Sequence, residues 1–187
     1  DNGEIVYWSN EAFSDTYLSR PSNEELYNFT SFKFLNNDFT KIRSKPKTSA
    51  HMGIHRNLDP LYNFSKTRLV KNLVHDLPLR TSALRTLGAF ANITSSESFL
   101  NDLAFAKNID PFKIRINHLD DERAIEVLEN LENTMKKSHA KPNNYRGIGF
   151  SRYKNSAAYC AVGVELNISD DLDIKLINAW ITVDAGE

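Results

Sequence analysis

The spacing of apolar residues changes near residue 140, and this change constrains the fold more than any other feature. Before it, apolar side chains recur at helical spacing. The clearest helical stripe contains Ala124, Val127, Leu128, Leu131 and Met135. After it, from Cys160 to Ile168, every second residue is apolar, which is typical of a strand. We therefore predict an α+β fold with mixed and antiparallel strands, a helical segment at about 95–137 and a C-terminal β-hairpin.

Three helices are expected in the helical segment. The first runs from about Ser95 to Lys107 with Thr94 or Ser95 as N-cap. Its predicted buried face consists of Phe99, Leu100, Leu103 and Ala106. A second, short helix follows Asp110-Pro111, because aspartate caps a helix and proline suits its first position. Asp120 or Asp121 then caps a third helix, which carries the stripe described above.

The strands are less regular. We predict a buried strand at Ile5–Trp8, a short strand at Phe32 and Phe34, an edge strand near 69–74 and an exposed basic loop at 41–47. In the C-terminal hairpin the apolar alternation slips between Leu176 and Ile177. This slip predicts either a β-bulge or a strand that is buried on both faces.

Composition excludes several functions. The 187 residues, 41% of them hydrophobic, are enough to bury one sizeable core or two small ones. A net charge of -1 disfavours a nucleic-acid partner. No apolar run approaches the roughly 20 residues of a spanning helix, so no transmembrane segment is expected. The single cysteine, Cys160, excludes an intrachain disulfide and an iron–sulfur cluster held by several cysteines of this chain.

The segment Leu79 to Asn92 reads as an extended stretch that turns into the start of a helix. Its core is Ala83-Leu84-Arg85-Thr86-Leu87-Gly88. This core resembles the pterin-cofactor loop of the molybdenum hydroxylases, the xanthine dehydrogenase and aldehyde oxidase family. Its details are similar to the molybdopterin-binding large subunits of the isoquinoline and nicotinate oxidoreductase branch.

Other segments extend the resemblance in the same order along the chain, leaving only Asn23–Ala50 unmatched. They are Trp8 with Arg20-Pro21, Arg56-Asn57 with Pro60-Leu61-Tyr62, Glu97-Ser98-Phe99 with Asp102-Leu103-Ala104, Asp110-Pro111 with Arg115, Arg152-Tyr153-Lys154-Asn155 with Ala158 to Val162, and Val183 to Gly186. The resemblance implies two units: residues 1–140 as part of the first molybdopterin-binding domain, and residues 141–187 as the start of the second.

The resemblance also implies a site. Its cofactor-binding residues are Leu84, Arg85, Thr86, Leu87 and Gly88, and Leu87 also bounds the substrate pocket, which Leu84 flanks. Purine-oxidising relatives carry phenylalanines in place of these leucines, so a purine substrate is disfavoured because stacking worth about 0.5–1.5 kcal/mol is lost. The alternatives are that Arg85 braces a helix entry with no ligand nearby, and that both leucines belong to the core.

The implied function belongs to a longer protein. The chain lacks the family's Gly-Gly-x-Phe-Gly loop and the Gly-x-Gly-Glu segment with the catalytic base. We therefore expect an internal piece that has no catalytic residue, binds no cofactor alone and is inactive alone. The parent subunit would bind molybdopterin and hydroxylate an aldehyde or N-heteroaromatic carbon with water. Its partners would be the remainder of the large subunit and an iron–sulfur subunit or domain, in the cytoplasm or alternatively the periplasm. The competing hypothesis is a non-catalytic scaffold or interaction module.

Histidine and cysteine offer no alternative centre. His51 and His55 are four residues apart, but Gly53 lies between them and no acidic third ligand has suitable spacing, so we expect loop histidines rather than metal ligands. Cys160 lies in an apolar strand pattern, which favours a buried structural thiol over a nucleophile.

Overall fold

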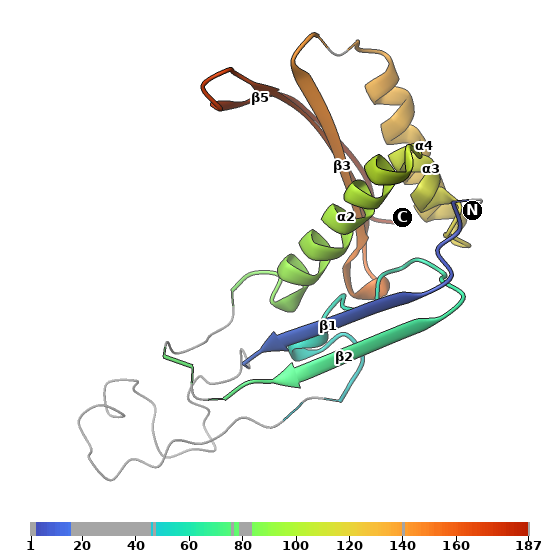
Figure 1. Ribbon diagram of the computed structural model, residues 1–187. Coiled ribbons are helices and arrows are strands. Elements are labelled where there is room, and N and C mark those ends of the chain that lie inside the picture. The colour runs from blue at the N-terminus through green and yellow to red at the C-terminus, as the bar shows by residue number, and fades with distance from the viewer. Residues whose placement is uncertain are drawn as a thin grey trace.

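The computed structural model describes residues 3–15, 46, 48–75, 77–78, 84–139 and 141–186. Its elements are β1 (Trp8–Ser14), the 3-10 helix η1 (Gly53–His55), β2 (Thr67–Leu73), α2 (Gly88–Lys107), α3 (Pro111–Ile116), α4 (Glu122–Lys136), β3 (Asn144–Arg152), the 3-10 helix η2 (Tyr153–Asn155), β4 (Tyr159–Ile168) and β5 (Ile174–Asp184). β1 and β2 form a parallel ribbon, and β3, β4 and β5 form an antiparallel sheet in that order (Figure 1). The predicted α+β class is confirmed.

Helices α3 and α4 begin where the sequence predicts. The Asp110 carboxylate accepts hydrogen bonds from the amides of Phe112 and Lys113, and the Asp121 carboxylate accepts one from the amide of Ala124. Each cap satisfies amides that the first turn of a helix leaves without an intrahelical acceptor. The buried residues of α4 are those of the predicted stripe: Ala124, Val127, Leu128, Leu131 and Met135.

The prediction for the first helix is wrong in its start and in its buried face. α2 begins at Gly88, with Leu87 as N-cap, so neither Thr94 nor Ser95 caps it. Its buried residues are Ala89, Asn92, Ser96, Glu97, Leu100 and Ala104, whereas Phe99 is 56% exposed. The apolar pattern failed here because the buried polar side chains all find hydrogen-bond partners, which removes most of the cost of burying them.

At the N-terminus, the predicted buried strand at Ile5–Trp8 is also wrong. β1 begins only at Trp8, and Val6 and Tyr7 are exposed. Trp8 is buried and its ring stacks on Phe64 with a centroid separation of 4.9 Å. The predicted edge strand near 69–74 is confirmed as β2. The predicted strand at Phe32 and Phe34 and the predicted loop at 41–47, apart from Pro46, lie outside the described residues.

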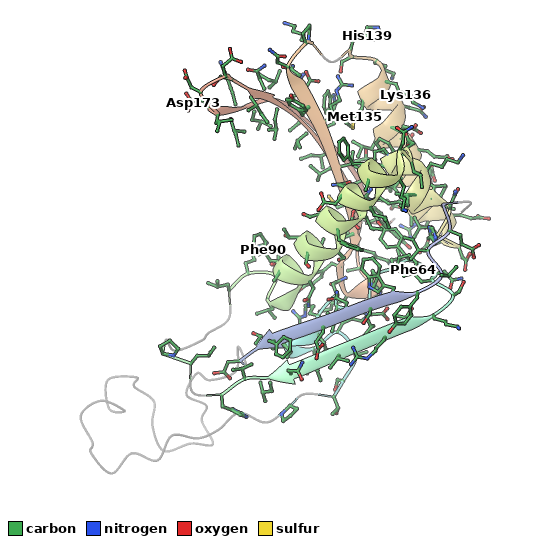
Figure 2. The ribbon with its side chains drawn as sticks, viewed as in Figure 1. Phe64, Phe90, Met135, Lys136, His139 and Asp173 are labelled. Atoms are coloured by element: carbon green, nitrogen blue, oxygen red, sulfur yellow. The ribbon has the colours of Figure 1, made fainter. Side chains whose placement is uncertain are left out.

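The C-terminal hairpin and its irregularity are confirmed. β4 and β5 pair around a turn whose tip contains Asp173 (Figure 2). Glu165 pairs with Asn178 while Leu166 pairs with Leu176, so Ile177 is the extra residue of a β-bulge. The bulge accounts for the slip in alternation, because one inserted residue reverses the side to which each following side chain points.

The sheet is covered by α4 on one face. That face supplies Ile148, Phe150, Tyr159 and Ala161 to a core that also contains Trp8, Tyr62, Phe64 and the stripe of α4. The alternating apolar residues of β4 lie on the other face, where Cys160, Val162 and Val164 are only half-buried. The two-unit division at residue 140 stays a prediction. No helix within the described ranges is long and apolar enough to cross a membrane.

Candidate functional site

The predicted cofactor turn lies at the surface, directly before α2. The side chains of Leu84, Arg85 and Thr86 are exposed and that of Leu87 is half-buried. The Leu87 amide donates to the Leu84 carbonyl at 3.0 Å, and the Ala89 amide donates to the Thr86 carbonyl at 3.2 Å. Within the described part of the chain, no acceptor is found for the amides of Arg85 and Thr86. Leu84 is 81% exposed, so the alternative that it belongs to the core is wrong.

The backbone of this turn is strained. Thr86 and Leu87 have φ values of 69° and 58°, and Leu87 combines its positive φ with a ψ of -135°. Residues other than glycine adopt such angles at a cost of about 1–3 kcal/mol each, and these conformations cluster at functional sites. Leu87 is therefore held in place by its surroundings rather than by its own preference.

Gly88 and Asn92 fix the turn against η1. A Cβ atom added at Gly88 would lie 2.9 Å from the carbonyl oxygens of both Gly53 and Ile54, so a larger residue cannot approach this closely. One turn later, the Asn92 amide donates to the carbonyl of Ile54 at 2.9 Å and to that of Arg56 at 3.0 Å. The start of α2 is thus held by backbone contact and by a buried side chain.

Arg56 and Asn57 connect this support to the β3–β4 connection. The Arg56 guanidinium donates to the Tyr153 hydroxyl at 2.8 Å. The Asn57 amide donates to the Arg152 carbonyl at 2.9 Å, and its side-chain oxygen accepts from the Lys154 amide at 2.8 Å. Both Arg56 and Asn57 are buried. Two segments that carry the family resemblance, nearly a hundred positions apart, are therefore in direct contact.

A buried ion pair joins two further segments of the resemblance. Glu97 on α2 accepts hydrogen bonds from the Tyr62 hydroxyl at 2.8 Å, from Arg115 Nε at 2.9 Å and from the Phe150 amide at 2.7 Å. Arg115 is 0% exposed and Glu97 7%. Burial, with the adjacent Glu97 carboxylate as the second cause, raises the pKa of Tyr62 well above its usual value of 10.0. A buried ion pair whose remaining donors and acceptors are hydrogen-bonded has a fixed geometry. This pair links α2 to α3 and β3.

The remaining hydrogen bonds of Arg115 indicate that this pair is structural. Its Nη1 donates to the Pro111 carbonyl at 2.7 Å, and its Nη2 donates to Asn101 Oδ1 at 2.9 Å. No donor of this guanidinium faces solvent, since the residue is fully buried. Its role is to hold α2 and α3 together behind the turn.

The histidines and the cysteine take structural positions. His55 lies in η1, where its ring contacts the Ser49 carbonyl and Lys71, and burial lowers its pKa. His118 is buried; its Nε2 accepts from the Ile5 amide at 2.8 Å, which leaves Nδ1–H to donate to the Ile114 carbonyl. Cys160 is half-buried, less than predicted, and desolvation raises the pKa of its thiol, which disfavours the thiolate. Among the described residues, no group of three or more His, Cys, Asp and Glu side chains is arranged to hold a metal ion.

The turn has the chemistry of a site for an oxygen ligand. The amides of Arg85 and Thr86 precede the N-cap of α2 and have no acceptor among the described residues, so an oxygen atom or anion could accept from them. Here the turn is exposed and α2 follows at once, so the predicted cofactor-binding residues from Leu84 to Gly88 can meet a group arriving from solvent or from another protein segment. Residues 79–83 of the predicted loop lie outside the described residues.

Comparison with known proteins points to one relative. No protein-family model matches the chain. The chain is 31% identical over 107 residues to one of the subunits of the nicotinate dehydrogenase of Pseudomonas putida. The alignment covers 52% of this chain and 9% of that relative, so the chain spans only a small part of the length of the curated protein it matches. The chain is thus similar to part of one subunit of an oxidoreductase.

Sequence reasoning singled out the turn with Gly88, and the Arg56-Asn57 segment, but it did not predict the contacts that support the turn. Gly88, Asn92 and Asn57 act through contacts with backbone carbonyls, and sequence alone does not show which carbonyls lie nearby. Buried polar residues in α2 were a usable signal: Asn92, Ser96 and Glu97 recur at helical spacing, as apolar core residues do.

Proposed function

We propose that this chain is part of the molybdopterin-binding subunit of an oxidoreductase that hydroxylates an aldehyde or N-heteroaromatic carbon with oxygen from water. The observation that carries the proposal is the exposed, strained turn at Leu84–Leu87, in the segment that resembles the pterin-cofactor loop. The similarity to part of a nicotinate dehydrogenase supports the same class of enzyme.

In this proposal the residues of the chain bind the cofactor and orient the substrate. The backbone of Leu84 to Gly88 would border the cofactor, and the amides of Arg85 and Thr86 would donate hydrogen bonds to it. Leu87 bounds the substrate pocket, and Leu84 flanks it. The molybdenum centre, when bound, supplies the redox and oxygen-transfer chemistry. An iron–sulfur subunit or domain would be the partner that supplies electron-transfer centres, in the cytoplasm or alternatively the periplasm.

The supports behind the turn explain how donors could be held in place before a ligand arrives. Gly88 and Asn92 hold the turn on η1, and Arg56 and Asn57 hold η1 on the β3–β4 connection. Donors fixed in advance need not reorganise when charge develops on an oxygen atom, and this is a major source of stabilisation in enzyme sites.

The test uses the intact protein encoded by the complete reading frame. We expect it to contain molybdenum by elemental analysis, and to reduce an artificial electron acceptor when supplied with an aldehyde or an N-heterocycle. Gly88→Val should displace the turn and lower kcat/KM about 100-fold, as expected for a small misplacement of a catalytic constellation. Arg68→Ala, at an exposed position of β2, is the matched control.

Two results would count against the proposal. A correctly folded intact protein without molybdenum leaves the non-catalytic scaffold or interaction module as the remaining hypothesis. Retention of both molybdenum and activity by Gly88→Val would instead show that the turn is not where the cofactor binds.

A further inference from the structure

One face of the β3–β4–β5 sheet is apolar, and among the described residues only α2 borders it, next to Gly149 of β3. Residues paired across an antiparallel sheet point to the same side, so the register defines this face. We call it the open face; its large side chains are Tyr145, Val162, Val164, Leu166, Ile168, Ile174, Leu176, Ile181 and Val183. None of them carries a charge. The opposite face is the one that packs on α4.

The open face differs from a solvated sheet face because its exposed side chains are apolar. Ile174 is 69% exposed, Ile181 66%, Leu176 59% and Val183 56%. In Figure 1 the tip of the hairpin projects away from α2 and α4. A half-solvated antiparallel sheet normally alternates apolar residues inside with polar residues outside. Contiguous apolar surface of this kind marks an interaction site.

Two glycines on the open face are an independent indication that another part of a protein packs there. Gly147 and Gly149 of β3 pair with Val164 and Val162, so they lie on the open face. A Cβ added at Gly149 would meet no atom within 4 Å. Nothing in the described structure therefore requires glycine at this position, although glycine inside a strand costs stability. Such glycines often occur where another backbone approaches closely.

A hollow adjoins Gly149. It has a volume of about 310 Å³ and lies between α2 and the sheet. Its lining includes Ile93 and Ser98 from α2, and Gly149, Cys160 and Val162 from the open face. The apolar face thus ends at an open hollow, whose side formed by α2 is mainly polar.

We propose that the open face packs against another part of the same, longer polypeptide. The aligned part is only 9% of the related protein, so most of such a polypeptide lies outside this chain. A segment of the same polypeptide is always present at high effective concentration, and it can cover a face without charges as the two layers of a domain core do. The inference rests on the proposed function only in treating the chain as part of a longer subunit.

Cysteine accessibility in the intact protein tests this inference. Ile181→Cys and Val183→Cys place thiols on the open face at positions exposed in the present structure. Asn133→Cys, on the exposed side of α4, is the matched control. Modification by a maleimide, followed by mass spectrometry of the peptides, gives the rate at each position. We expect the two thiols on the open face to react at least ~100-fold more slowly than the control.

The outcomes separate this inference from the proposed function. Rates equal to the control overturn the inference, even if the same preparation contains molybdenum. Protection that disappears on dilution to a monomer also overturns it, because a second copy would then be the occupant. Protection that persists in a monomer without molybdenum supports the inference while the proposed function fails. Hydroxyl-radical footprinting of Tyr145, Ile181 and Val183 in the unsubstituted intact protein gives the same readout without any variant.

Discussion

Among single residues, Gly88 has little room to change, because the atoms nearest to it belong to the backbone of η1. An alanine at the first position of a helix normally stabilises the chain by up to about 1 kcal/mol relative to glycine. At Gly88 the added Cβ would lie 2.9 Å from two backbone carbonyl oxygens, which cannot move without shifting η1. The steric cost should therefore exceed the gain in helix propensity.

We predict that Gly88→Ala lowers the free energy of unfolding of the chain by about 1–3 kcal/mol, the usual cost of overpacking. Urea denaturation measures this change. Gly149→Ala is the matched control, because its Cβ would meet no atom within 4 Å and should leave the stability of the chain unchanged or slightly raised. Equal effects of the two substitutions would contradict the close approach of α2 to η1.

Tyr62 makes the buried ion pair sensitive to alkaline pH. Its pKa is raised in the folded state, first by burial and second by Glu97, so the folded protein binds this proton more tightly than the unfolded chain does. The stabilisation is fully present below the unfolded pKa of 10.0 and is lost as pH rises above it. Tyr62→Phe removes the titrating group together with one hydrogen bond.

We predict that Tyr62→Phe costs about 1 kcal/mol of stability at about pH 8 and much less at about pH 11. The measurement is the free energy of unfolding by urea at the two pH values. Tyr145→Phe, at an exposed position, is the control. A loss for Tyr62→Phe that is the same at both pH values would argue against the raised pKa.

At the scale of elements, the predictions were confirmed where caps and apolar spacing in the sequence match the residues that are buried. Asp110-Pro111 and Asp121 define helix starts through contacts with amides two or three residues away, and the stripe of α4 follows directly from its apolar spacing. The bulge at Ile177 was visible as a slip in alternation. For α2, the apolar residues are not the buried ones, because Asn92 and Glu97 gain partners from η1 and β3 that are distant in sequence.

The sequence also did not predict which face of the β3–β4–β5 sheet is buried. Its two faces both carry apolar residues, so the pattern of β4 does not show which face α4 covers. The buried set, Tyr159, Ala161, Gly163 and Glu165, is the less apolar of the two. Glu165 is tolerated there because Arg146 forms an ion pair with it at 2.6 Å. Hydrogen bonds from Asn144, and then from Arg146, lower the pKa of this carboxyl.

The start of α4 and the end of β5 are joined by the pair of Arg123 and Asp184. Arg123 donates to both carboxylate oxygens of Asp184, at 2.7 and 2.6 Å. These hydrogen bonds, with a smaller contribution from the Gly186 amide, lower the pKa of Asp184 from 3.8 to about 2. The stabilisation from this pair is present above the unfolded pKa and is lost as pH falls toward the folded one.

We predict that Arg123→Gln raises the pKa of Asp184 toward 3.8 without reaching it, because the Gly186 amide still donates to the carboxylate. An NMR titration of the side-chain carboxyl carbon measures the pKa. Arg68→Gln, an exposed arginine on β2, serves as the control and should leave the Asp184 titration unchanged. An unaltered pKa in Arg123→Gln would show that the ion pair does not form in solution.

For the whole molecule, Asn57 joins two segments of the candidate site's support that are nearly a hundred positions apart. The family resemblance identified Arg56-Asn57 and Arg152 to Asn155 as separate segments, and the structure shows that they contact one another. Sequence alone could not show this, because the contact depends on a side chain that meets backbone groups nearly a hundred positions away. The candidate site is therefore a surface turn whose position depends on contacts spread over much of the chain.

The position of Asn57 requires both a hydrogen-bonding side chain and a left-handed backbone, and two substitutions can separate these requirements. Its side chain bonds to the Arg152 carbonyl and the Lys154 amide, and its backbone has a φ of 55°, which glycine adopts freely and alanine does not. We predict that Asn57→Gly loses about 1–3 kcal/mol of stability through the unsatisfied buried groups. Asn57→Ala should lose about 1 kcal/mol more, since the left-handed conformation costs alanine more than glycine loses through its freer unfolded chain. Urea denaturation of both variants measures the two contributions, and an alanine variant as stable as the glycine variant would show that Asn57 is not left-handed in solution.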